Sequence, residues 1–83
     1  MTILYFSWVR TEIGQESEAT SPPPEVTTLG QLRDWLTSLG PGHAKALGPG
    51  SPVRAAVNHE IALPDHPVTP EDEVAFFPLF SGG

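Results

Sequence analysis

The last two residues of the sequence, Gly82 and Gly83, are the strongest candidates for chemistry. A C-terminal carboxylate can be activated as an acyl-adenylate. Because glycine has no β-carbon, a chain that ends in two glycines can enter a channel that is too narrow for any side chain. We therefore predict that a separate activating enzyme reaches and activates the carboxylate of Gly83. The alternative is that the two glycines belong to an ordinary frayed terminus.

The residues that precede the glycines favour the first interpretation. The glycines follow a strongly apolar segment rather than a polar one, and the ring of Pro78 restricts the direction in which the chain continues. Leu79 and Phe80 are apolar in a segment expected to be exposed, which indicates a groove on a partner protein. Ser81 and Gly82 are small residues, so they would allow a partner enzyme to reach the terminal carboxylate.

Other groups that could perform chemistry lack a suitable arrangement. His43, His59 and His66 are far apart in the sequence, without metal-ligand spacing, and we expect all three to lie on the surface. The acidic run at residues 71–73 lacks the alternating ligands and the glycine of a calcium loop, so we expect it to be solvated. The absence of cysteine excludes thiolate catalysis and zinc–thiolate sites. We expect no bound metal or cofactor.

Strands are predicted where β-branched and aromatic residues gather. The predicted strands cover residues 2–9, residues 53–58, a short stretch around Ile61 and Leu63, and residues 74–77. The first strand is apolar on both faces, so it is either central in its sheet or has one face against a partner. A weaker strand is expected within the acidic, proline-rich loop at residues 15–25.

One main helix should begin after Thr28, which stands three residues before Gln31 in the spacing of a capping box. Apolar residues then recur with helical period as far as Leu39. Gly40 is expected to end the helix in a left-handed conformation. A short second helix is predicted over residues 41–47. Strands on both sides of one main helix indicate an α+β fold.

Size and charge restrict the function further. A chain of 83 residues forms one domain with a thin core, which disfavours an enzyme with a deep cleft. The net charge of −6 and the scattered arginines and lysine argue against nucleic-acid binding. No apolar run approaches the roughly 20 residues that span a bilayer. Without disulfides or a signal peptide, the chain is expected in the cytoplasm.

The sequence resembles the small subunit of molybdopterin synthase, a family of ubiquitin-like sulfur carriers. The similarity runs through nearly the whole chain, from residues 6–10 (Phe-Ser-Trp-Val-Arg) through the main helix to residues 55–58 (Ala-Ala-Val-Asn). Its most specific part is the string at residues 65–83, which contains Asp-His-Pro, then Asp-Glu-Val-Ala-Phe-Phe-Pro, and a final Ser-Gly-Gly.

The resemblance implies a ubiquitin-like β-grasp fold over residues 1–78, a mixed sheet packed on one main helix, with residues 79–83 as a flexible tail. It also implies that a ubiquitin-activating-type adenylyltransferase uses ATP to adenylate Gly83, which is then converted to a thiocarboxylate. The sulfur would be donated to a cyclic pyranopterin precursor in molybdenum cofactor biosynthesis. The catalytic side chains would reside in the large subunit, in a heterotetramer of two large and two small subunits.

The resemblance also implies contact residues. Phe6, Ile61 and Phe77 correspond to apolar positions that pack against the large subunit and the activating enzyme, although plain core positions are the alternative. Arg10 matches a polar contact, with a surface salt bridge as the alternative. Pro78, Leu79 and Phe80 complete the predicted contact set. Leu79 and Phe80 replace the usual proline and small aliphatic residue, so this tail should be bulkier and less stiff.

Two other functions remain open. The same fold and tail could serve another acceptor, as in thiamine, cysteine or tRNA thiolation. The chain could instead be an interaction module that performs no tail chemistry.

Overall fold

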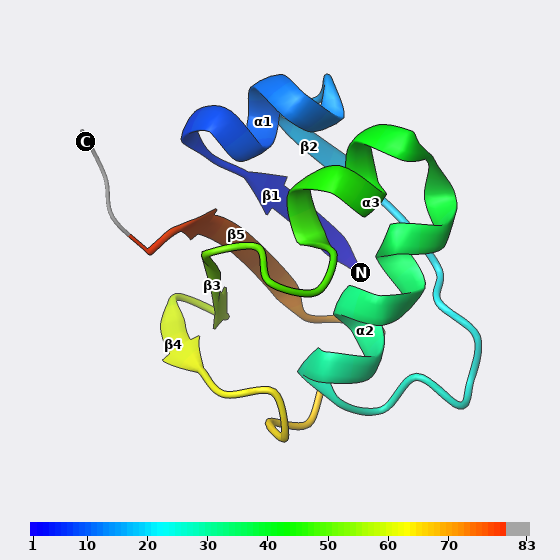
Figure 1. Cartoon of the computed structure of the whole chain (residues 1–83). Helices are drawn as coiled ribbons and strands as arrows, with labels where there is room; N and C mark the ends of the chain where they lie inside the picture. Colours follow the sequence, from blue (N-terminus) through cyan, green and yellow to red (C-terminus); the bar gives the residue numbers. More distant parts are fainter. Residues whose placement is uncertain (80–83) are drawn as a thin grey trace.

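A computed structural model describes residues 1–79 of the chain. Within that range, five strands form one mixed sheet in the order β2-β1-β5-β3-β4 (Figure 1). Of the pairings in this sheet, only that of β1 with the central strand β5 is parallel. The strands are β1 (Thr2–Tyr5), β2 (Ser17–Ala19), β3 (Val53–Val57), β4 (Glu60–Ala62) and β5 (Glu73–Pro78).

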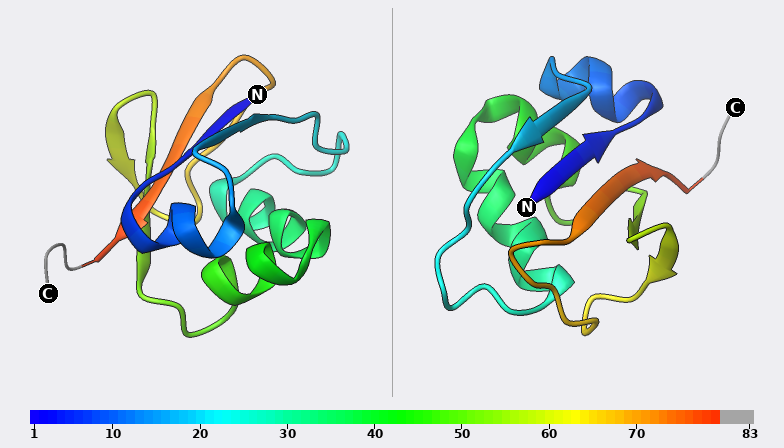
Figure 2. Two further views of the ribbon diagram at one scale, coloured as in Figure 1. Left: turned by 90° about the horizontal axis from the view of Figure 1, so that it is seen from above. Right: turned by 180° about the vertical axis from the view of Figure 1, so that it is seen from behind.

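The described helices gather on one face of this sheet, which leaves the opposite face without a helical layer (Figure 2). They are α1 (Ser7–Ile13), α2 (Leu29–Leu36), the 3-10 helix η1 (Thr37–Leu39) and α3 (Pro41–Leu47). Helices α1 and α3 pack against each other, and their approach is close where a β-carbon on Gly42 would come within 2.5 Å of the carbonyl oxygen of Glu12. The predicted α+β class and β-grasp architecture are confirmed.

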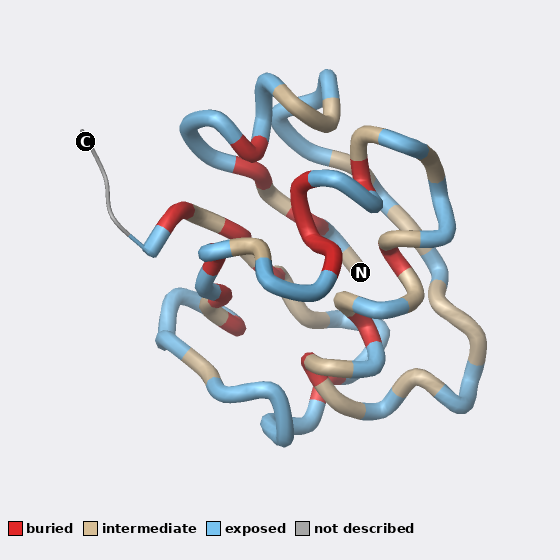
Figure 3. Tube along the Cα trace, viewed as in Figure 1, coloured by how far each residue is buried: buried red, intermediate tan, exposed pale blue. Residues whose placement is uncertain are grey.

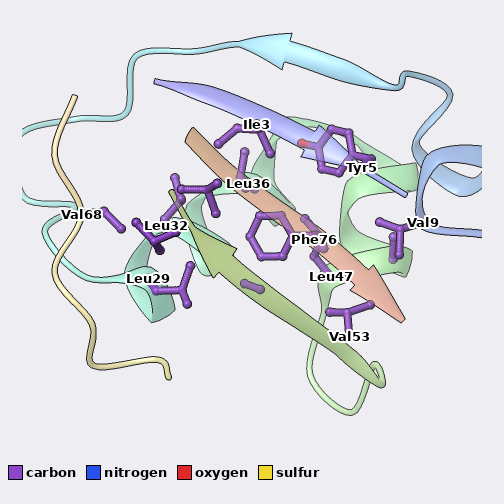
Figure 4. Close-up of a cluster of buried hydrophobic side chains, with 14 residues drawn as sticks. Ile3, Tyr5, Val9, Leu29, Leu32, Leu36, Leu47, Val53, Val68 and Phe76 are labelled. Atoms are coloured by element: carbon purple, nitrogen blue, oxygen red, sulfur yellow. The ribbon is translucent and has the colours of Figure 1, made fainter. Parts of the chain in front are cut away.

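The core lies between the sheet and the helices (Figures 3 and 4). Phe76 of β5 lies near its centre, with its ring stacked on that of Tyr5 at a centroid distance of 6.3 Å. Leu32 and Leu36 of α2 are fully buried against it. The alternation along β5 is complete: Val74, Phe76 and Pro78 are buried, whereas the residues between them are only half-buried.

The first predicted strand is wrong in its second half. The strand ends at Tyr5, and residues 7–13 form α1 instead. The chain reverses at Ser7, whose φ of 57° lies in the left-handed region, and this reversal lets β2 return antiparallel to β1. Val9 and Ile13 are four residues apart and both face the core, and this helical spacing is the signal that a strand interpretation overlooks.

The main helix begins as predicted. The Thr28 hydroxyl accepts a hydrogen bond from the backbone N–H of Gln31 at 3.2 Å, and the Gln31 side chain accepts one from the N–H of Thr28 at 3.1 Å. The α-helix ends earlier than expected, at Leu36, and continues as η1. The predicted left-handed cap at Gly40 is wrong: this residue is extended (φ 171°), because it also precedes Pro41 at the start of α3.

The remaining predicted elements are confirmed with small shifts in their bounds. The helix over residues 41–47 is present as α3, and the weak strand in the acidic loop is β2. The turn between β3 and β4 is made by Asn58 and His59, both in the left-handed region. The loop that joins β2 to α2 runs along the opposite side of the molecule from the end of β5 (Figure 1). None of the helices in residues 1–79 is both long enough and apolar enough to cross a membrane.

Candidate functional site

The sheet face that lacks helices carries a row of apolar residues. Strand alternation places Leu4, Ala56, Ile61 and Ala75 on the face opposite the core-facing residues of their strands, which in β4 is the partly buried Ala62. These four are neighbours in register, because Leu4 pairs with Ala75, Ala75 with Ala56, and Ala56 with Ile61. The row therefore crosses four adjacent strands, from β1 through β5 and β3 to β4.

Phe77 extends this row toward the end of β5. It is half-buried, pairs with Arg54 of β3, and lies on the same face as Ala75. Together, Leu4, Ala56, Ile61, Ala75 and Phe77 are called the outer apolar patch below. Ile61 is 70% exposed within the chain, so Ile61 itself is not a core residue. An apolar side chain this exposed on an uncovered sheet face fits a protein contact.

Phe6 lies beside the patch, at the end of the sheet where β5 finishes and the tail begins. Its backbone is extended, its N–H donates to the carbonyl of Phe76 at 3.1 Å, and 47% of its surface is exposed. Because β1 and β5 are parallel, their C-terminal ends lie side by side at this end of the sheet. Helix α1, which carries the exposed Arg10, therefore starts beside the point where the chain leaves β5. The structure brings Phe6 and Phe77 together with Pro78 and Leu79, which are called the tail base below.

The last described residues anchor the tail to the sheet. Pro78 is buried and pairs with Val53 as the final residue of β5, so it offers a partner far less surface than Phe6 or Ile61. Leu79 is 42% exposed, and its N–H donates to the carbonyl of Pro52 at 2.8 Å. The other predicted tail residues, Phe80, Ser81, Gly82 and Gly83, lie outside the described residues.

A polar cluster in the core was not predicted. The Tyr5 hydroxyl donates to Oε2 of Glu18 at 2.7 Å, and Nε2 of His43 lies 2.7 Å from the same oxygen. The prediction that His43 lies on the surface is therefore wrong, since only 8% of it is exposed. His59 and His66 are exposed as expected. This cluster fastens the edge strand β2 to α3.

The cluster shifts the pKa values of two of its members. Burial, with the nearby carboxylate of Glu18, raises the pKa of the Tyr5 hydroxyl, so the phenol stays protonated and remains a donor. Burial alone would raise the pKa of Glu18, but the hydrogen bonds from Tyr5 and His43 outweigh it and lower that pKa. The carboxylate therefore stays ionised as a structural acceptor for both neighbours.

Within the acidic run at residues 71–73, Asp72 has a structural role rather than a catalytic one. Asp72 accepts hydrogen bonds from the Asn58 amide at 2.9 Å and from the N–H of Thr69 at 2.7 Å, and these bonds lower its pKa. Asn58 in turn accepts from the N–H of Glu73 at 3.0 Å. The Asn58 and Asp72 side chains thus tie the β3–β4 turn to the start of β5.

A groove of about 380 Å³ opens between α2 and the β3–β4 edge. Its lining is mostly apolar and includes Leu29, Val53 and Phe76, which belong to the helix side of the sheet. The sheet separates these residues from the outer apolar patch. We therefore place the candidate contact surface on the outer face rather than in this groove.

The sequence matches a known protein family over nearly its whole length. A family model described as the ThiS family matches residues 3–83. The molybdopterin synthase sulfur carrier subunit of Escherichia coli (strain K12) is 38% identical over 81 residues, which cover 98% of this chain and 96% of that protein.

Solved structures share the fold at lower sequence identity. SAMP1 from Haloferax volcanii superposes with a TM-score of 0.80 at 23% identity, covering 100% of this chain and 98% of that one. CysO from Mycobacterium tuberculosis gives a TM-score of 0.65 at 21% identity, covering 95% and 98%. The family match and the close relative confirm the resemblance found in the sequence: the chain belongs to the ThiS family and is a sulfur carrier of that type.

Proposed function

We propose that this chain is the small subunit of a molybdopterin synthase and donates sulfur from a thiocarboxylate formed on Gly83. The observation that carries the proposal is the position of the tail base: β5 ends at the edge of an uncovered apolar sheet face, next to Phe6 and Phe77. The identity to a molybdopterin synthase sulfur carrier subunit supports the choice of pathway.

The proposed chemistry takes place on the terminal carboxylate and requires no side chain of this protein. The Gly83 carboxylate attacks the α-phosphorus of ATP on an activating adenylyltransferase, releasing pyrophosphate and forming an acyl-adenylate. Sulfide-level sulfur (HS⁻ or its equivalent from a sulfur donor) then displaces AMP from the acyl carbon, which gives a thiocarboxylate with no change of oxidation state. In the synthase, this sulfur attacks the cyclic pyranopterin precursor, and water then cleaves the bond between the Gly83 acyl carbon and the sulfur, which leaves the sulfur on the pterin and regenerates the carboxylate. Two charged carriers supply the two sulfurs of the dithiolene, and the catalytic side chains come from the large subunit.

The fold contributes recognition and delivery. We propose that the outer apolar patch, with Phe6, packs against the large subunit and against the adenylyltransferase, and that Arg10 adds a polar contact at the rim. We propose that Leu79 and Phe80, the first two residues of the tail, contact the partner beside this patch. The proposed setting is the cytoplasm, and the proposed assembly is a heterotetramer of two large and two small subunits.

Intact-mass measurement tests the sulfur chemistry. The protein is incubated with the activating enzyme, ATP and a sulfur source, and a mass gain equal to the replacement of one oxygen by sulfur is expected. The matched control carries one alanine appended after Gly83, which moves the carboxylate off the glycine pair and should abolish the gain. Absence of the gain in the wild type, or an equal gain in the extended variant, would contradict the proposal.

A second measurement separates the pathways. The thiocarboxylated protein is mixed with a molybdopterin synthase large subunit and the pterin precursor, and the dithiolene product is expected. If the thiocarboxylate forms but no large subunit binds it, the carrier serves a different acceptor. If the appended-alanine variant retains all cellular function, the chain is an interaction module.

A further inference from the structure

The loop between α3 and β3, residues 48–52, holds the base of the C-terminal tail. Pro78 ends β5 opposite Val53 and has no N–H to donate to the sheet. The next N–H, that of Leu79, donates to the carbonyl of Pro52 at 2.8 Å. The direction in which the chain leaves the sheet therefore depends on where this loop places one carbonyl oxygen.

The loop is held in shape by contacts with α3. A β-carbon on Gly48 would collide with the carbonyl of Ala44, so the chain passes the helix end at a distance that only glycine allows. The Ser51 hydroxyl donates to the carbonyl of Ala46, and the Ser51 N–H donates to the carbonyl of Gly48 at 3.1 Å. These bonds fold the loop back onto the last turn of α3.

Arg33 of α2 joins these parts. Its Nε donates to the carbonyl of Leu47 at 2.6 Å, and its Nη2 donates to the carbonyls of Gly48 at 3.2 Å and Ser51 at 3.1 Å. Carbonyls at the end of a helix lack partners within the helix, so a cation placed there is stabilising. One planar guanidinium satisfies acceptors on both the helix end and the loop, which a single ammonium group cannot match.

We propose that Arg33 is a positioning residue for the tail, acting through the loop at residues 48–52 and the Pro52–Leu79 hydrogen bond. Its effect on sulfur loading rests on the proposed function, whereas its effect on the tail base does not. The rival explanation is that Arg33 only caps α3. A cap contributes to the stability of the whole domain and has no selective effect on Leu79.

Amide hydrogen exchange followed by NMR distinguishes the two explanations. In R33Q, exchange of the Leu79 amide should accelerate by about tenfold, the factor that corresponds to releasing the backbone of one residue. Exchange of the Phe76 amide, deep in the core, should change by a smaller factor. The matched control is K45Q, which removes one positive charge from the exposed side chain of Lys45 on α3 and should leave Leu79 unchanged.

Two results would overturn the positioning role. One is an unchanged Leu79 exchange rate in R33Q, and the other is an acceleration equal to that of Phe76, which would mark a general loss of stability. Should R33Q fail to fold, R33K serves in its place. Lysine keeps the charge but cannot span three carbonyls, so Leu79 should still exchange faster than in the wild type.

Steady-state adenylation by the activating enzyme tests the functional half. If the Leu79 backbone is less restrained, it must be ordered on binding, so R33Q should raise the KM for the carrier several-fold while kcat is unchanged. An unchanged KM together with faster Leu79 exchange would remove the functional role. If the wild type is not adenylated, the proposed function fails, and the exchange result still decides whether Arg33 positions the tail base.

Discussion

At the scale of single residues, the partly buried Tyr5–Glu18–His43 cluster is the main departure from an apolar core. Glu18 lies on a three-residue edge strand, and Tyr5 and His43 come from β1 and α3. An edge strand this short has few ladder bonds, so the side-chain bonds contribute much of what holds β2 in place. A hydrogen bond to a charged group stabilises a fold by about 1.5–3 kcal/mol.

We predict that E18Q lowers the free energy of unfolding by about 1.5–3 kcal/mol near neutral pH. The pKa of Glu18 in the folded protein is below its ordinary value of 4.5. Its contribution is therefore complete above that ordinary value and is lost as the pH falls through the folded pKa. Urea unfolding at a series of pH values should show a weaker acid dependence for E18Q than for the wild type.

The control for this prediction is E16Q, which removes a carboxylate from an exposed residue beside the same strand. It should retain the wild-type acid dependence, to which Asp72, whose pKa is also lowered, contributes in every variant. Equal acid profiles for E18Q and the wild type would show that the cluster does not couple stability to pH.

At the scale of elements, β5 has two different roles on its two faces. Phe76 is buried in the core, whereas the adjacent Phe77 lies on the outer apolar patch. Strand alternation alone separates the two side chains, and the parallel pairing with β1 brings the end of this strand next to Phe6. One strand thus anchors the core, contributes to the contact face and leads to the tail.

We predict that F76A destabilises the protein by about 3–5 kcal/mol, because it leaves a cavity at the centre of the core. F77A should cost about 1 kcal/mol, since only part of its ring is buried within the chain. Denaturant unfolding monitored by circular dichroism measures both values. Losses of equal size would mean that Phe77 is a core residue.

At the scale of the whole molecule, the fold has two layers, and only one face of the sheet is covered by helices in residues 1–79 (Figure 2). The exposed face carries the outer apolar patch, and the tail base lies at its edge. The net charge of −6 gives copies of this chain a mutual repulsion that opposes self-association through the apolar patch. A partner that covers the sheet face would therefore also lie next to Leu79, where the described chain ends.

We predict that I61D weakens binding of the molybdopterin synthase large subunit by at least about tenfold, because it places a charge on the contact face. Its free energy of unfolding should stay within about 0.5 kcal/mol of the wild type, since Ile61 is mostly exposed. Titration calorimetry and thermal unfolding measure the two effects.

The matched control is L39D. Like Ile61, Leu39 is an exposed aliphatic residue, with 41% of its surface accessible. Unlike Ile61, it lies in η1 on the helix side of the molecule. It should leave large-subunit binding unchanged. If L39D weakens binding as much as I61D does, the contact surface is not on the outer sheet face.

Local sequence determined most of the elements. The start of the main helix after Thr28, the short helix over residues 41–47 and the last strand around residues 74–77 each depend on neighbours within a few residues, so the sequence predicts them correctly. The glycine pair and the string before it identified the family, because they are an unbroken stretch of sequence.

Only the tertiary structure decided how distant residues meet. The reversal at Ser7, whose φ lies in the left-handed region, ends the first strand at Tyr5 and lets β2 pair antiparallel with β1. Glu18 and His43 are 25 positions apart, and Arg33 and Ser51 are 18 apart. Their hydrogen bonds exist because packing buries polar groups that then require partners, a condition that no local pattern expresses.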